Sequence, residues 1–292
     1  MKDVMIRNKK YQYTEDIKDN DSLRFSFNKL CYETFGFDFE SWYQEGYWSD
    51  TFIPHVLIVD EEVVANISVN ILKFKMSSGI KTYIQIGTVM TKQRYRGKGC
   101  GDFLMHTILN DWKLKADAIY LYANGSVLDF YSNYDFRRAY EHQFTYYPST
   151  VPTHDFEPLI LNQETHPLLL DLYHHGNPFA SASLIDNPGF FMFYCLGFFE
   201  DCLYYSKQEN TLVIYDDSQN LIYDVFGSPS VSLTTILDCF ASEELFLGFT
   251  PEEMDPMDYA PLVEEDTYLL VYSKKENPFK DSVMMLPLLS HA

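Results

Sequence analysis

The pattern of apolar and polar residues predicts a first half built mainly from strands. Apolar residues recur at the helical period over 22–33, and Ser22 is the expected N-cap of that helix. Runs rich in β-branched and aromatic residues predict strands, separated by polar or glycine-containing turns. The strands expected up to residue 90 cover 55–59, 63–72 and 81–90, with turns at 60–62 and 77–79.

A glycine-rich basic loop at 92–101 interrupts this pattern. Beyond it, the apolar spacing predicts a helix, a strand, a short helix and a last strand. These elements cover 102–114, 118–123, 127–134 and 138–146. Strands followed by alternating helices and strands predict an α/β (α+β layered) domain, in which helices flank a mixed sheet.

Prolines at 148, 152 and 158 predict a linker, and a second block of elements follows it. The order of these elements echoes the first half. That echo fits either a weak internal duplication or a second, unrelated α/β layer. The expected helices cover 167–175, 188–196 and 233–240, and the expected strands 203–205, 212–215, 221–226, 245–249 and 268–272.

Charge separates the two halves sharply. The 292 residues include 22 Lys and Arg against 42 Asp and Glu, which gives a net charge of −20. Residues 1–150 hold 18 basic and 19 acidic side chains, whereas residues 151–292 hold 4 and 23. This contrast predicts two domains, 1–150 and 151–292. The acidic balance excludes nucleic-acid backbones and anionic membranes as expected partners, and it suits cationic ones.

Composition predicts a folded chain, because 46% of the residues are hydrophobic and Phe and Tyr number 23 each. The five cysteines form no C-x-x-C pair, and the first residues lack the apolar run of a signal peptide. We therefore expect a cytoplasmic protein with free thiols. His174-His175 has neither an H-E-x-x-H motif nor cysteine partners, so no metal site is expected.

The segment 88–101 carries the strongest chemical signal. Glycines stand at alternate positions 97, 99 and 101, where they let the backbone turn sharply and approach a ligand. Four basic side chains lie within 92–98, and the helix that follows offers unpaired N–H groups to an anion such as a pyrophosphate. The spacing matches neither a P-loop nor the dinucleotide motif.

The motif Arg96-x-x-Gly99-x-Gly101 does match R-x-x-G-x-G, the coenzyme A signature of the GCN5-related N-acetyltransferase (GNAT) family. The chain resembles that family over roughly 22–147, which implies a GNAT fold with acetyl-CoA as co-substrate. The second half lacks the signature, so we expect a degenerate GNAT-like copy that shapes the acceptor pocket or mediates a homodimer. The residues implied to contact coenzyme A are Val89, Met90, Thr91, Arg94, Arg96, Gly97, Lys98, Gly99, Cys100, Gly101, Asp102 and Asn124.

The segment 130–136 resembles the family's F-Y-x-x-x-G-F. By its place in that motif, Tyr131 is the implied catalytic acid, which protonates the departing thiolate. The alternative is a tyrosine that serves packing only. Asp135 stands where the family has glycine, and Asp tolerates the left-handed backbone such a turn requires. A backbone N–H within 89–91 is implied to polarise the thioester carbonyl.

The general base is less clear from the sequence. Gln85 stands where some histone-directed family members have a glutamate base, and an amide takes no proton at neutral pH. In some multi-domain relatives, such as the enhanced-intracellular-survival acetyltransferases, the terminal carboxylate enters the catalytic pocket. The apolar tail 284–292 therefore suggests Ala292 as a catalytic group, with His291 as a second possible base. The alternative is a tail packed only for stability.

Nine aromatic residues lie within 32–52, and Asp38, Glu40, Glu45 and Asp50 are interleaved among them. The resemblance places this region beside the acceptor, and aromatic faces with carboxylates suit a cationic amine. Glu45, Trp48 and Gln85 are the expected substrate-binding residues, although most such rings could equally belong to the core.

These observations predict an acetyl-CoA-dependent N-acetyltransferase that acts on a primary amine of a small-molecule or peptide acceptor. Polyamines, aminoglycosides, amino acids and protein amines all remain open as acceptors. The alternative is a non-catalytic acyl-CoA-binding or sensor protein with the same fold.

Overall fold

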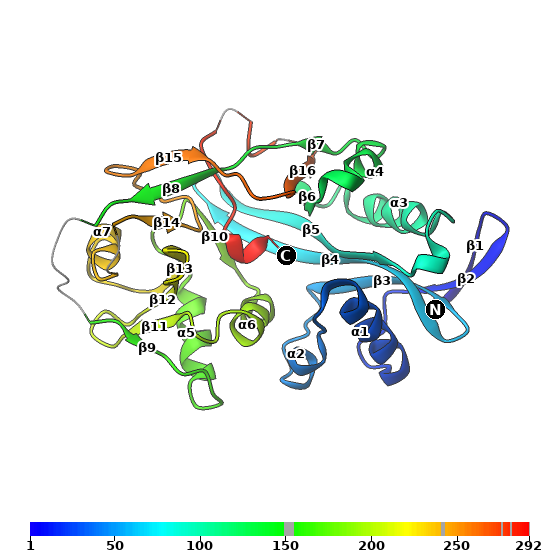
Figure 1. Ribbon diagram of the computed structural model, residues 1–292, viewed down its shortest axis with the longest axis horizontal. Helices are drawn as coiled ribbons and strands as arrows, with labels where there is room; N and C mark the ends of the chain where they lie inside the picture. Colours follow the sequence, from blue (N-terminus) through cyan, green and yellow to red (C-terminus); the bar gives the residue numbers. More distant parts are fainter. Residues whose placement is uncertain (149–154, 241–242, 276, 281, 292) are drawn as a thin grey trace.

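The computed structural model describes residues 1–292 except 149–154, 241–242, 276, 281 and 292. Two sheets lie side by side, and helices cover their faces (Figure 1). This mixed α/β architecture confirms the expected fold class. The five cysteines are all free.

The first sheet is mostly antiparallel, with one parallel pair, β5 and β6. A further strand, β10 (Ala182–Ile185), pairs with the end of β4. In spatial order the other strands are β1 (Lys2–Ile6), β2 (Lys9–Thr14), β3 (Phe52–Val59), β4 (Glu62–Met76), β5 (Gly79–Thr91), β6 (Ala118–Ala123), β16 (Tyr268–Tyr272) and β7 (Arg137–Arg138).

Helices cover both faces of this sheet, because its central strands are apolar on both sides. Helix α1 (Asp21–Phe35) packs below the sheet in Figure 1, and α3 (Cys100–Trp112) packs above it. Val56 of β3 belongs to the α1 core and its neighbour Leu57 to the α3 core, as strand alternation requires. Two shorter helices, α2 (Glu40–Gln44) and α4 (Leu128–Ser132), complete these layers.

The second sheet has one parallel pair as well, β13 and β14. Its strands in spatial order are β15 (Asp258–Pro261), β8 (His142–Tyr146), β14 (Leu245–Leu247), β13 (Leu221–Gly227), β12 (Thr211–Asp216), β11 (Leu203–Ser206) and β9 (Glu157–Pro158). Its helices are α5 (His166–His175), α6 (Pro188–Gly197) and α7 (Leu233–Leu237).

The two halves exchange strands across residue 150. The second half supplies β16 to the first sheet, where it pairs with β6, and the first half supplies β8 to the second sheet, where it pairs with β14. The two sheets share one order of elements: an antiparallel meander is followed by a helix and then by a parallel strand. These elements are β3–β4–β5, α3 and β6 in the first sheet, and β11–β12–β13, α7 and β14 in the second. The sheets therefore do not divide at residue 150, and their shared order is what a degenerate internal copy predicts.

Two local expectations were wrong, and one hairpin was missed. Asn20, not Ser22, caps α1, because its side-chain oxygen accepts a hydrogen bond from the Leu23 N–H at 3.1 Å. The strand expected over 138–146 is broken, since the chain crosses from the first sheet to the second after β7. The hairpin β1–β2 was missed, because its strands are short and mostly exposed.

One buried carboxyl group makes stability depend on pH. Burial raises the pKa of Asp224 on β13 to about 7, and Asn177 Nδ2 donates to its Oδ1 at 2.5 Å. The folded state therefore holds a proton that the unfolded chain has lost above about pH 4. The contribution of Asp224 to the free energy of unfolding is fully present below that pH. It is lost as the pH rises to 7, which lowers the free energy of unfolding by about 4 kcal/mol at most. We expect the melting temperature to drop from pH 5 to pH 7.5, and Asp224→Asn to reduce that drop. An equal drop in both proteins would contradict this assignment.

Candidate active site

The parallel strands β5 and β6 separate toward their carboxyl ends. They pair at Tyr83, Ile84 and Gln85, but β5 continues to Thr91 without further pairing to β6. A left-handed residue, Thr88 with φ 45°, and a shift of register against β4 accompany this separation. Beyond Gln85 the edge of β5 is thus not paired with β6, which is the kind of strand edge to which an extended ligand can pair. Asn66 already donates to the Thr88 carbonyl and Arg96 to the Thr91 carbonyl.

The glycine-rich loop joins this open edge to the start of α3. Gly99 is the N-cap, with φ 86°, and supplies no side chain to bond the first-turn N–H groups. A Cβ atom on Gly99 would lie 3.1 Å from Ile6 and 3.2 Å from Arg7 of the β1–β2 hairpin. Burial raises the pKa of the Cys100 thiol, so its side chain stays protonated. Cys100 can therefore offer a ligand its backbone N–H but not a thiolate.

The basic side chains of the loop divide into two groups. Lys92 and Arg94 both bind Glu62, and the Lys92 contact is the main cause holding the pKa of that carboxyl below its usual range. Arg96 Nε donates to the Thr91 carbonyl at 3.0 Å. Lys98 lies 5.4 Å from the centre of the Tyr95 ring. Glu62 thus offsets one of the two positive charges of Lys92 and Arg94. No ion pair holds Arg96 or Lys98 among the described residues.

The hairpin that the sequence did not reveal adds a basic group here. Arg7 Nη1 donates to the Gly97 carbonyl at 2.8 Å and so holds the loop in place. The expected coenzyme A residues from Val89 to Asp102 are contiguous and stay together. Asp102 accepts a hydrogen bond from the Tyr134 hydroxyl at 2.7 Å, which ties the segment after α4 to α3.

Asn124 contacts the second half of the chain. Its side-chain amide donates to the Asp266 carbonyl at 3.1 Å, and the Gly125 N–H donates to the Asp266 carboxylate at 2.8 Å. Asn124 therefore fastens the loop before β16 to the end of β6. In this structure its donor serves a contact between the halves of the chain.

Tyr131 lies in α4, where it packs on Phe130 and Phe136. Its side chain is buried, and burial raises its pKa to about 12. A phenol with that pKa keeps its proton throughout the neutral range. Asp135 has φ 64°, so the expected left-handed turn is present.

A second feature is an aromatic cavity of about 300 Å³ on the α1 side of the first sheet. The segment after α1, helix α6 and the end of the chain all contribute to its wall. Its polar lining comes from Asn70, Gly87 and Thr88 of β4 and β5, from Tyr194 and from His291. The other lining residues are Phe35, Phe37, Phe39, Trp42, Phe52, Phe190, Phe193 and Phe198. The second half of the chain therefore helps to form this cavity.

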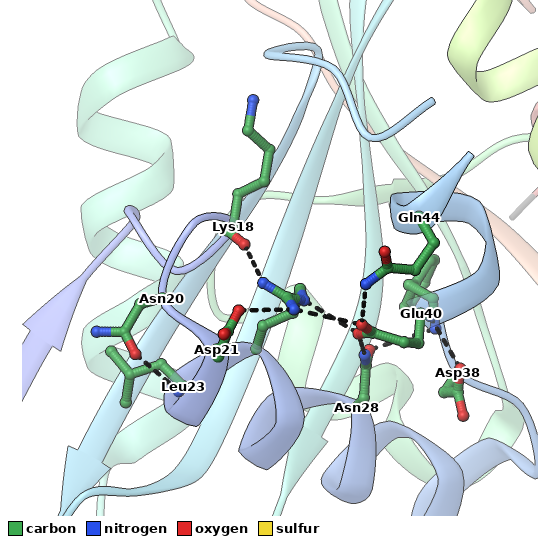
Figure 2. A network of polar contacts seen from close by, with 10 residues as sticks. Lys18, Asn20, Asp21, Leu23, Asn28, Asp38, Glu40 and Gln44 are labelled. Atoms are coloured by element: carbon green, nitrogen blue, oxygen red, sulfur yellow. Dashed lines mark hydrogen bonds and ion pairs between the residues drawn. The ribbon is translucent and has the colours of Figure 1, made fainter. Parts of the chain in front are cut away.

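The carboxylates expected beside an acceptor point elsewhere. Arg24 Nε donates to Glu40 Oε2 at 3.0 Å. Figure 2 shows Asn28 and Gln44 also donating to the Glu40 carboxylate. Asp38 bonds the Glu40 backbone N–H at 2.9 Å, and Asp50 pairs with Lys18. No carboxylate side chain lines the cavity in the part of the chain that the structure describes.

Two of the expected substrate-binding residues do not reach the cavity. Glu45 is exposed beyond α2. Trp48 is a core residue that stacks on Trp42 at 5.8 Å, and Trp42 is the one that lines the wall. Gln85 is fully buried and accepts a hydrogen bond from Asn70, which places it just behind the lining.

The end of the chain is packed between the two sheets. Leu286 belongs to a core cluster with Tyr120 of β6, whereas Leu289 packs with α5 and α6. The Tyr120 hydroxyl donates to the Ser290 carbonyl at 2.9 Å. The tail is thus a structured element, as its apolar sequence indicates. Ala292 lies outside the described residues.

His291 follows this segment and lines the aromatic cavity. Its Nε2 lies 3.2 Å from the Leu286 carbonyl and 3.5 Å from the Glu141 carboxylate, both acceptors. These neighbours favour the proton on Nε2 and leave a lone pair on Nδ1. That Nδ1 is buried and has no hydrogen-bond partner among the described residues. The ring stacks on Tyr122 at 4.2 Å.

Comparison with solved structures agrees with this geometry. A GCN5-related N-acetyltransferase from Kribbella flavida has a TM-score of 0.57 at 12% identity, over 91% of this chain and 72% of that one. Eis1 from Mycobacterium abscessus gives 0.55 at 12% identity, over 89% and 72%. A conserved protein of unknown function from Enterococcus faecalis V583 gives 0.60 at 14% identity, over 91% and 72%.

The chain therefore has the GCN5-related N-acetyltransferase fold. The similarity extends over most of the chain, including the second sheet and its helices. No family model matches the sequence, and no curated protein matches it either. The described residues contain no helix long and apolar enough to cross a bilayer. Within those same residues, no group of three or more His, Cys, Asp or Glu side chains is arranged to hold a metal.

Proposed function

We propose that the protein is an acetyl-CoA-dependent N-acetyltransferase acting on a primary amine of a small-molecule or peptide acceptor. The observation that carries this proposal is the open edge of β5, which runs into the uncapped start of α3. That arrangement suits a donor with an extended amide-bearing arm and a pyrophosphate. Arg96, Lys98 and the N–H groups of the first α3 turn would hold the phosphates.

The reaction needs a proton acceptor for the amine and a proton donor for the thiolate. The amine nitrogen bonds the thioester carbon, and the carbon–sulfur bond breaks. His291 Nδ1 would take the amine proton, while Leu286 and Glu141 hold the other ring nitrogen. Backbone N–H groups at 89–91 would stabilise the developing oxyanion. Tyr131, protonated at neutral pH, would donate to the leaving thiolate.

Tyr131→Phe tests both the acid and the proposed activity. We expect kcat for acetyl-CoA-dependent thiol release to fall about 100-fold, because the thiolate then leaves unprotonated. Acetyl-CoA affinity measured by calorimetry should be unchanged. The exposed Tyr140→Phe is the matched control. An unchanged kcat would remove Tyr131 from the mechanism. Tight acetyl-CoA binding by the wild type without turnover on any amine would instead favour a sensor.

A further inference from the structure

The side chains that line the aromatic cavity indicate which kind of ligand it can hold. Eight of its lining residues are Phe or Trp, and several stack on one another across the junction of the two halves. Phe39 stacks on Phe193 at 5.2 Å, and Phe37 meets Phe198 edge-on at 5.9 Å. The Trp42 Nε1–H donates to the Gly189 carbonyl at 2.7 Å, which fixes the Trp42 ring against α6. Most of the wall is thus aromatic, and its rings pack on one another across the two halves.

Two buried polar atoms on the same lining lack partners. They are Thr88 Oγ1 and His291 Nδ1, and neither has a hydrogen-bond partner among the described residues. Thr88 Oγ1 and the lone pair of His291 can both accept. Buried polar atoms are normally satisfied, so each of these atoms indicates a place where a ligand N–H or O–H could donate. A neutral primary amine carries two such N–H donors.

Apart from its aromatic faces, the rest of the cavity offers no anionic partner for a second ammonium group within the described residues. Asp, Glu, Lys and Arg side chains are absent from its lining within the described residues. A second ammonium group buried there would lose its hydration without a compensating ion pair. Polyamines and aminoglycosides, which carry several charges, are therefore poor ligands for this space.

We propose that the acceptor is a primary amine on an apolar body, aromatic or aliphatic, and that this body fills the aromatic cavity. The inference rests on the proposed acetyl transfer and names its substrate class. The amine donates to Thr88 Oγ1 and His291 Nδ1, and its own lone pair stays free for the thioester. A cavity of about 300 Å³ is within the range of small-ligand sites.

The test compares two amines of the same length, hexylamine and 1,5-diaminopentane, which differ by a methyl group in place of an ammonium. We expect kcat/KM for hexylamine to exceed that for the diamine by at least about 100-fold. Tryptamine and 2-phenylethylamine should be accepted, and spermidine and kanamycin should not. Equal or greater kcat/KM for the charged amines would overturn the inference and leave the acetyltransferase proposal standing.

A pair of variants on α1 tests the cavity itself. Phe35 lines the cavity and is 45% exposed, so Phe35→Glu places a carboxylate at its rim without disturbing the core. This change should reduce the preference for hexylamine about tenfold. Tyr32, 63% exposed on the same helix and outside the lining, provides Tyr32→Glu as the control. Equal effects of both variants would contradict binding in this cavity.

Binding gives a readout independent of turnover. Trp42 lies in the cavity wall, so an apolar amine should change tryptophan fluorescence of the CoA-bound protein, whereas 1,5-diaminopentane should not. If no amine is acetylated but hexylamine binds in this way, the proposed reaction fails and the ligand class stands. If neither amine binds, the inference is wrong. If turnover requires a longer acyl-CoA and hexylamine does not bind, the cavity holds the acyl chain instead.

Discussion

Replacing Gly101 with glutamate is expected to lower the affinity for coenzyme A by about 100-fold or more. The residue lies in the first turn of α3, where the uncapped N–H groups would hold the pyrophosphate. A carboxylate there would occupy the same N–H groups and repel the phosphates. Isothermal titration with coenzyme A measures the loss.

Gly101 is a better site for this test than Gly99. A Cβ on Gly101 would meet Phe130 at an ordinary 3.4 Å, whereas Gly99 has φ 86° and a crowded approach to Ile6. Gly101→Ala therefore serves as the matched control and should retain most of the affinity. A carboxylate also suits the first turn of a helix, so Gly101→Glu should melt no lower than the wild type. Retained coenzyme A affinity in Gly101→Glu would refute the loop as the donor site.

The loop could be predicted from the sequence because its signal is local. Alternate glycines, a preceding strand and a following helix occupy one short stretch, 88–102, and the structure keeps them contiguous. The left-handed turn at Asp135 was predictable for the same reason. The strand β6 and the strand β16 were also placed correctly, because each is a compact apolar run.

The partners of these elements depend on contacts between distant residues. Nothing in the local pattern shows that β8 joins the second sheet or that β16 pairs with β6. The aromatic segment shows the same limit, since Trp42 and Trp48 are equally apolar and differ only in which one meets α6. The number of carboxylates among the aromatic residues does not show where they point. Arg24 holds Glu40 and Lys18 holds Asp50, and neither carboxylate lines the cavity.

His291→Ala is expected to lower kcat by about 100-fold or more, because a positioned general base contributes that much. Its Nδ1 is buried on the cavity lining and its Nε2 is held by Leu286 and Glu141, so the residue is oriented as a base. Acetyl-CoA affinity should not change, since the loop of the donor site is untouched. Added imidazole should restore part of the rate by occupying the space that the ring leaves.

The control for this variant is His174→Ala, which removes an exposed histidine from α5 and should leave kcat unchanged. Glu141→Gln separates positioning from proton transfer: it keeps the shape beside Nε2 but removes the charge, so kcat should fall less than in His291→Ala. A chain extended by one glycine after Ala292 keeps His291 and moves the terminal carboxylate. A large loss of kcat in that extended chain, with none in His291→Ala, would assign the base to the terminal carboxylate and overturn the role of His291.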